Sequence, residues 1–157
     1  MAHRPDIVRS RSMRAAAAAL DFYAVCLIGY EHAVPEGFHS NRARWPVRVA
    51  MTRDPTEITK KTDLEQPLHS VVVLAYVWTT SDAHAKRLKL KLDGYLLGWE
   101  DDAALRHGWR DLDDPINAWP VLLNLAVTDI RRREDIDVFD ETERQNRINR
   151  HRRRQWQ

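Results

Sequence analysis

Apolar residues in this sequence gather into three short runs that are typical of β-strands. The runs cover Phe22–Tyr30, Pro46–Met51 and Ser70–Trp78, and they are rich in aromatic and β-branched residues. In the second run apolar and polar residues alternate, so Arg48 faces away from its apolar neighbours. The third run is almost continuously apolar, which predicts a strand that is covered on both faces.

After the third run, apolar residues recur at every third or fourth position. This period predicts a helix over Asp82–Leu97 that packs one face on the core. Thr79–Asp82, directly before it, supplies residues that cap helix N-termini. The inward positions are Ala85, Leu88, Leu92 and Tyr95.

Other segments favour helix less strongly. Ser12–Leu20 is rich in alanine, and Asp54-Pro55 is a favourable start for a short helix that runs to about Asp63. A further helix is expected to open at Asn117, and a polar helical stretch is expected from Glu134 to the end. The inward residues of the helix after Asn117 are expected to be Val121, Leu122, Leu125 and Ile130. Two segments are expected to be irregular: Glu31–Trp45 as a long loop, and Glu100–Asp114 as irregular or briefly helical.

This order of elements predicts an α+β fold, with a small three-stranded mixed sheet flanked by helices and a basic helical tail at the C-terminus. The first two strands are expected to pair as an antiparallel hairpin, and the third, which follows a helix, to run parallel to its neighbour. We expect a basic, alanine-rich helix over residues 1–21, an α/β domain over 22–130 and an arginine-rich tail over 131–157.

The net charge of +2 conceals an uneven distribution of charge along the 157 residues. Residues 144–157 contain six arginines and no acidic residue, whereas residues 61–143 carry an excess of acidic residues. Four of the arginines are spaced three, three and four apart and therefore share one helical face. Such a stripe attracts polyanions. Glu141 and Glu143 precede it, so the pattern also suits a helix stabilised by its own dipole.

The charge pattern leaves two partners open. The arginines of the tail are expected to contact the phosphates of DNA or RNA, with Trp156 stacking on bases and basic residues of the helix over Asp82–Leu97 assisting. Alternatively, the tail docks on an acidic protein surface, including residues 100–114 of another copy in self-association. The candidate binding residues are Arg144, Arg147, Arg150, Arg152, Arg153, Arg154, Trp156, Lys86, Arg87, Lys89 and Lys91.

Residues 22–110 resemble the GIY-YIG nuclease superfamily, in particular its divergent, phage-associated members. FYAVCLIGY resembles the first strand of that family, and PVRVAMTRDP resembles its second strand running into its first helix. Gly108-Trp109 resembles an ending seen in divergent members. The resemblance implies a phage or mobile-element origin and a nuclease site built from two tyrosines, an arginine and a metal-binding glutamate.

Few of these catalytic positions match in this sequence. Tyr23 stands for the first tyrosine and Arg53 lies near the place of the arginine, whereas Val49–Met51 replaces the second tyrosine motif. No acidic residue lies between Asp82 and Asp93, where the glutamate is expected. We therefore expect a non-catalytic relative without a cofactor or a metal site. The alternative is an endonuclease that uses Mg²⁺.

The remaining features concern the compartment. Cys26 is the single cysteine and lies in an apolar run, so we expect a buried thiol and a reducing environment. The apolar runs are far shorter than the roughly 20 residues of a membrane-spanning helix. Basic residues precede Ala15–Leu20 as in a signal peptide, but no small-residue cleavage site follows. The sequence therefore predicts a cytoplasmic protein with no contact to a membrane.

Overall fold

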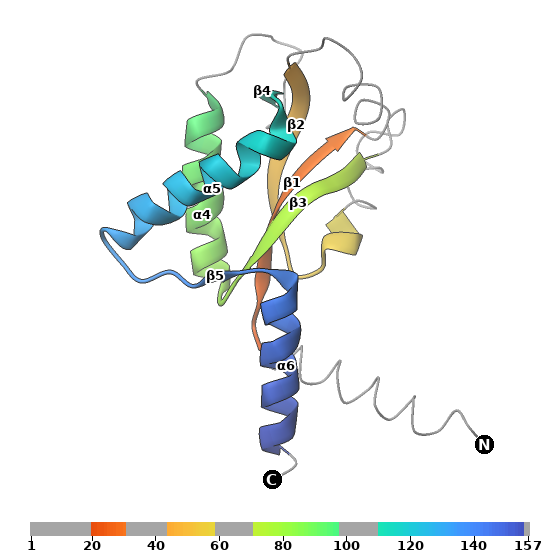
Figure 1. Ribbon diagram of the computed structural model, residues 1–157, viewed down its shortest axis with the longest axis vertical. Coiled ribbons are helices and arrows are strands. Elements are labelled where there is room, and N and C mark those ends of the chain that lie inside the picture. The colour runs from red at the N-terminus through yellow and green to blue at the C-terminus, as the bar shows by residue number, and fades with distance from the viewer. Residues whose placement is uncertain (1–19, 31–43, 59–70, 98–109, 156–157) are drawn as a thin grey trace, which may run out of the picture.

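The structure, a computed structural model, describes residues 20–30, 44–58, 71–97 and 110–155 (Figure 1). Five strands and three long helices lie in these ranges. Their order is β1 (Tyr23–Tyr30), β2 (Arg44–Thr52), β3 (Val71–Thr79), α4 (Asp82–Leu97), β4 (Arg110–Asp113), α5 (Pro115–Arg131), β5 (Val138–Phe139) and α6 (Glu141–Gln155). The α+β class predicted from the sequence is confirmed.

The strands form one sheet in the order β4-β2-β1-β3-β5. β1 and β2 pair as the predicted antiparallel hairpin, with Cys26 opposite Ala50. The prediction of a mixed sheet was wrong, because β3 also runs antiparallel to β1, with Cys26 opposite Tyr76. The central position of β1 explains its composition, since it is hydrogen-bonded on both edges and packed on both faces.

The prediction of three strands missed the two short edge strands. β4 falls in the acidic segment that was expected to be irregular, and its Leu112 pairs with Trp45 of β2 and is buried. β5 has only two residues, which pair with Trp78 and Thr79 of β3. It interrupts the continuous helix that was expected from Glu134. Neither strand could be recognised in the sequence, because each is too short to show a clear alternation of apolar and polar residues.

One face of the sheet is covered by α4 and α5, which cross it in Figure 1. Ala85, Leu88 and Leu92 of α4 are at most 1% exposed, as their spacing predicted. Tyr95 lies at the rim of this core, and its hydroxyl donates to Asp129 of α5 at 3.0 Å. Burial of Tyr95, followed by this carboxylate, raises the pKa of its phenol.

The inner face predicted for the helix after the acidic segment was right for Leu122 and Ile130 but wrong for Val121 and Leu125. α5 begins at Pro115, two residues before Asn117, after Asp114 in a left-handed conformation with φ of 42°. Val121 and Leu125 were expected inside, but they are 61% and 52% exposed. The buried residues are Pro115, Trp119, Ala126, Val127 and Ile130. Apolar residues extend around most of this helix, so their pattern alone did not fix which face turns inward.

The other face of the sheet carries a smaller apolar cluster. Cys26 and Trp78 are buried here together with Phe139 of β5. Burial raises the pKa of the Cys26 thiol to about 12, so the thiol stays protonated at neutral pH. α6 starts directly after Phe139 and buries a single residue, Ile148.

Capping side chains fix where several helices begin. Asp54 accepts a hydrogen bond from the amide of Thr56 at 3.0 Å, and a helical turn over residues 55–58 follows. This turn confirms the expected helix start, and the rest of that helix, to about Asp63, lies outside the described residues. Ser81 accepts from the amide of His84 at 3.1 Å before α4, and Asp140 accepts from the amide of Glu143 at 2.8 Å before α6. None of the helices in the described ranges has the length and apolar character needed to cross a membrane.

Candidate nucleic-acid interface

The first turn of α6 is fastened to β3 by one carboxylate. Trp78 donates its indole N–H to Oε2 of Glu141 at 2.6 Å, and the Tyr76 hydroxyl lies 3.4 Å from the same oxygen. Oε1 of Glu141 accepts hydrogen bonds from Arg144 and Gln145, each at 2.9 Å. Burial, followed by the charge of Glu141, raises the pKa of Tyr76. The start of α6 is therefore fixed to the sheet through Oε2 of Glu141, whereas Oε1 is bonded by two residues of α6 itself.

Two arginines that were expected to contact a partner instead pack on aromatic rings of the same chain. The guanidinium carbon of Arg144 lies 4.4 Å from the centre of the Trp78 ring. That of Arg147 lies 3.8 Å from the centre of the Phe139 ring. Both side chains are at most 25% exposed. Cations over aromatic rings stabilise a contact, most strongly where water is excluded.

Acidic residues surround Arg147. Two nitrogens of its guanidinium donate to the two carboxylate oxygens of Asp137, at 2.5 and 3.2 Å, and its Nε donates to Glu143 at 3.1 Å. Arg150 donates to the same oxygen of Glu143 at 2.7 Å. The hydrogen bond to Asp137 raises the pKa of Arg147, and the hydrogen bond from Arg147 lowers the pKa of Glu143. Three of the four arginines of the stripe, Arg144, Arg147 and Arg150, are thus paired with acidic residues of the same chain.

The last turn of α6 is different. Arg152, Arg153 and Arg154 form no ion pair with another residue of the described ranges, and Arg153 and Arg154 are exposed. Figure 1 shows this part of α6 projecting past the end of the sheet, away from α4 and α5. No acidic residue follows Glu143 in the sequence. Among the described residues, the three arginines therefore form a concentrated positive charge without an acidic partner, on a helix that is anchored at its other end.

The predicted basic residues of α4 are each paired with an acidic residue. The pairs are Lys86 with Asp82 at 3.0 Å, Arg87 with Glu134, Lys89 with Asp93 at 2.7 Å and Lys91 with Asp129 at 3.1 Å. Lys86 and Lys89 pair with residues four positions away on the same helix. Their charges are therefore locally balanced, in contrast to those at the end of α6.

The two weak catalytic candidates lie together. The guanidinium carbon of Arg53 is 5.3 Å from the centre of the Tyr23 ring, and the same guanidinium pairs with Asp21. Within the ranges that the structure describes, no group of three or more potential metal ligands is found. Trp156 and residues 100–109 of the acidic segment lie outside those ranges.

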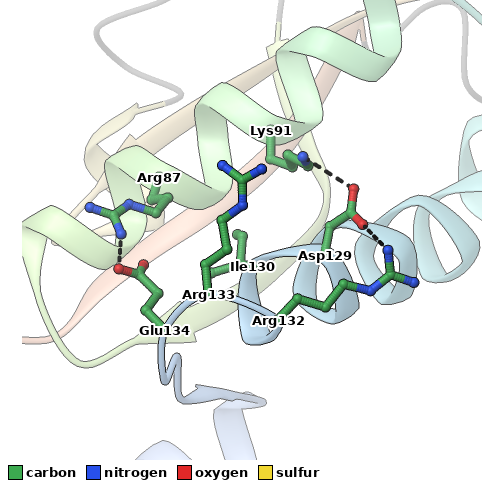
Figure 2. Close-up of a pocket in the computed structure, with 7 residues that line it drawn as sticks. All are labelled: Arg87, Lys91, Asp129, Ile130, Arg132, Arg133 and Glu134. Carbon is green, nitrogen blue, oxygen red and sulfur yellow. Dashed lines mark hydrogen bonds and ion pairs between the residues drawn. The ribbon is translucent and has the colours of Figure 1, made fainter.

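The sequence prediction did not single out a second group of arginines, Arg131–Arg133, at the end of α5. Arg132 and Arg133 are exposed and line a pocket between α4 and α5 (Figure 2). Three consecutive arginines after an apolar helical pattern were the available signal, but the sequence could not show that α4 lies beside them.

Comparisons of this chain with family models, with curated proteins and with solved structures give no match. The resemblance to the GIY-YIG superfamily therefore stays a prediction.

Proposed function

We propose that this chain is a non-catalytic nucleic-acid-binding protein that contacts phosphates through the last turn of α6. The observation that carries the proposal is the contrast within one helix. Arg144 and Arg147 hold α6 on the sheet, whereas Arg152–Arg154 project without an acidic partner in the described ranges. Fixed cations on a rigid element lose less conformational freedom on binding than cations on a disordered tail.

The number of free arginines sets the expected dependence on salt. Three phosphate contacts on duplex DNA give a slope of about −3 for the logarithm of affinity against the logarithm of salt concentration. Between 50 and 200 mM salt the affinity would then fall about 40-fold. A slope near −6 would mean that all six arginines of the tail reach phosphate, which the contacts of Arg144 and Arg147 oppose.

The test is fluorescence anisotropy with short DNA and RNA duplexes, comparing two variants of equal charge change. The first changes Arg152, Arg153 and Arg154 to Gln. The matched control changes the three consecutive arginines at the end of α5, Arg131–Arg133, to Gln. We expect the first variant to lose most of its affinity and the control to keep it. Equal losses in both variants would show that only overall charge matters, and the proposed surface would be wrong.

The same experiment separates the alternative partners. If the wild-type chain binds an acidic polypeptide such as polyglutamate but neither duplex, the tail serves protein assembly and not nucleic-acid binding. Incubation of plasmid DNA with Mg²⁺ or Mn²⁺ tests the nuclease alternative. We expect no cleavage; cleavage that is lost in Tyr23→Phe and Arg53→Gln would instead establish a catalytic protein.

A further inference from the structure

A pocket of about 450 Å³ opens between α4 and the end of α5. Figure 2 shows its lining: two cations from α4, two from the end of α5, two acidic residues and one apolar residue. The lining residues are Arg87, Lys91, Asp129, Ile130, Arg132, Arg133 and Glu134. The volume lies in the range of pockets that take small organic ligands, about 300–1,000 Å³.

The charges in this pocket do not balance. Asp129 is shared by Lys91 at 3.1 Å and Arg132 at 3.3 Å, and Glu134 pairs with Arg87. Arg133 forms no ion pair with any residue of the described ranges. Four cations therefore face two carboxylates, which leaves an excess of two positive charges in one partly enclosed space.

Both carboxylates of the pocket are paired with cations of the same pocket. Oδ2 of Asp129 accepts from Tyr95 and Lys91, and Oδ1 accepts from Arg132. The hydrogen bonds from Lys91 and Tyr95, in that order, lower the pKa of Asp129, and the charges of Lys91 and Arg132 lower it further. One oxygen of Glu134 pairs with Arg87, and the other is buried with no hydrogen-bond partner in the described ranges. Among the four lining cations, only Arg133 has no acidic partner in the described ranges, so it is the cation most available to a ligand.

Arg133 is the central group. Its guanidinium reaches across to α4 and lies between Arg87 and Lys91 (Figure 2). Cations at the end of a helix commonly stabilise its last carbonyls. The side chain of Arg133 instead points towards two like charges, an arrangement that an anion between them would stabilise.

We propose that this pocket binds a small phosphomonoester. A phosphomonoester carries nearly two negative charges at neutral pH, which match the excess of two positive charges, and an arginine fork suits its oxygens. A phosphodiester of a nucleic-acid backbone carries one charge and matches less well. The volume leaves space for the organic group beside the phosphate. This site is separate from the end of α6 and does not depend on the function proposed for it.

Isothermal titration calorimetry at pH 8 and fixed ionic strength tests the proposal with ribose 5-phosphate as the probe. Dimethyl phosphate, a monoanionic diester, and ribose, which has no phosphate, are the control ligands. We expect ribose 5-phosphate to bind and both control ligands to bind at least about tenfold more weakly, since each lost charge-assisted hydrogen bond weakens binding by roughly that factor. Absence of ribose 5-phosphate binding at millimolar concentrations would overturn the proposal, as would equal affinity for dimethyl phosphate.

Two variants locate the site. Arg133→Gln removes an exposed side chain that has no ion-pair partner in the described part of the chain, so the fold should be preserved. Arg153→Gln makes the same change at the end of α6. We expect at least about a tenfold loss of ribose 5-phosphate affinity for the first variant and no change for the second. Equal effects of the two variants would show general charge attraction and would refute this site. Binding of duplexes should be unchanged in Arg133→Gln. The proposal for the pocket and the proposal for the end of α6 can therefore fail independently of each other.

Discussion

Replacing Arg147 with glutamine tests whether the arginine stripe of α6 mainly stabilises the fold. The change removes the paired hydrogen bonds to Asp137, the hydrogen bond to Glu143 and the contact with the ring of Phe139. Because only 25% of the side chain is exposed, these contacts are partly shielded from water. A substitution at a solvated arginine would remove none of them.

The magnitude follows from the individual contacts. Each of the two carboxylate contacts contributes about 0.2–1 kcal/mol. The cation over the aromatic ring adds about 0.5–1 kcal/mol. Together they predict a loss of about 2 kcal/mol in the free energy of unfolding for Arg147→Gln. For a chain of this length such a loss lowers the melting temperature by about 4–8 °C.

Thermal and urea unfolding, followed by circular dichroism and tryptophan fluorescence, measure this loss. Arg153→Gln is the matched control and is expected to change stability by less than about 0.5 kcal/mol. A double-mutant cycle with Asp137→Asn isolates the energy of that pair from the contact with Phe139. If Arg147→Gln is as stable as the Arg153 control, Arg147 does not hold α6 on the sheet. The proposed contrast between an anchored first part and a free last turn of α6 would then be wrong.

Three further changes test other parts of the fold. The pKa of Glu143 is lower in the folded chain than its ordinary value of 4.5. The ionised Glu143 therefore stabilises the folded chain above that value, and this contribution is lost as the pH falls through the pKa of the folded state. The melting temperature should fall on acidification below about pH 4.5, and it should fall less steeply in Glu143→Gln. Gly94→Ala, where an added Cβ meets no atom within 4 Å in an α-helix, should raise stability by about 0.5–1 kcal/mol; a lower melting temperature would contradict this. Leu88→Ala should cost about 2–5 kcal/mol in urea unfolding, whereas Leu90→Ala, at a site that is 70% exposed, should cost far less; similar losses would mean that α4 is turned differently on the sheet.

The sequence predicted best those elements whose own residues repeat with a clear period. The buried face of α4 is the clearest case, because its helical spacing continues over two or more turns; β3 was predicted from an almost unbroken apolar run. β4 and β5 could not be predicted, since Leu112 is a single apolar residue and Val138-Phe139 a single apolar pair in polar surroundings, and they become strand residues only through their partners in β2 and β3.

The ion pairs of the candidate site could likewise not be predicted from the sequence. The spacing of the arginines correctly placed them in one helix. The spacing could not show that Asp137 lies beside Arg147, because the turn through Asp140 that brings them together is not periodic. Nor could it show that Arg133 reaches α4, since that contact depends on how two helices pack.

Loss of the C-terminal segment would also remove the two-residue strand β5, which covers an edge of the sheet. It covers only Trp78 and Thr79 at the outer edge of β3, and within the described ranges no other strand pairs with that edge. A chain cleaved or terminated before Val138 would lose α6 together with Phe139 and would expose backbone donors and acceptors next to Trp78. Uncovered strand edges of this kind promote self-association into aggregates. A prematurely terminated chain would therefore become prone to aggregation and to removal by proteases, whatever the arginines bind.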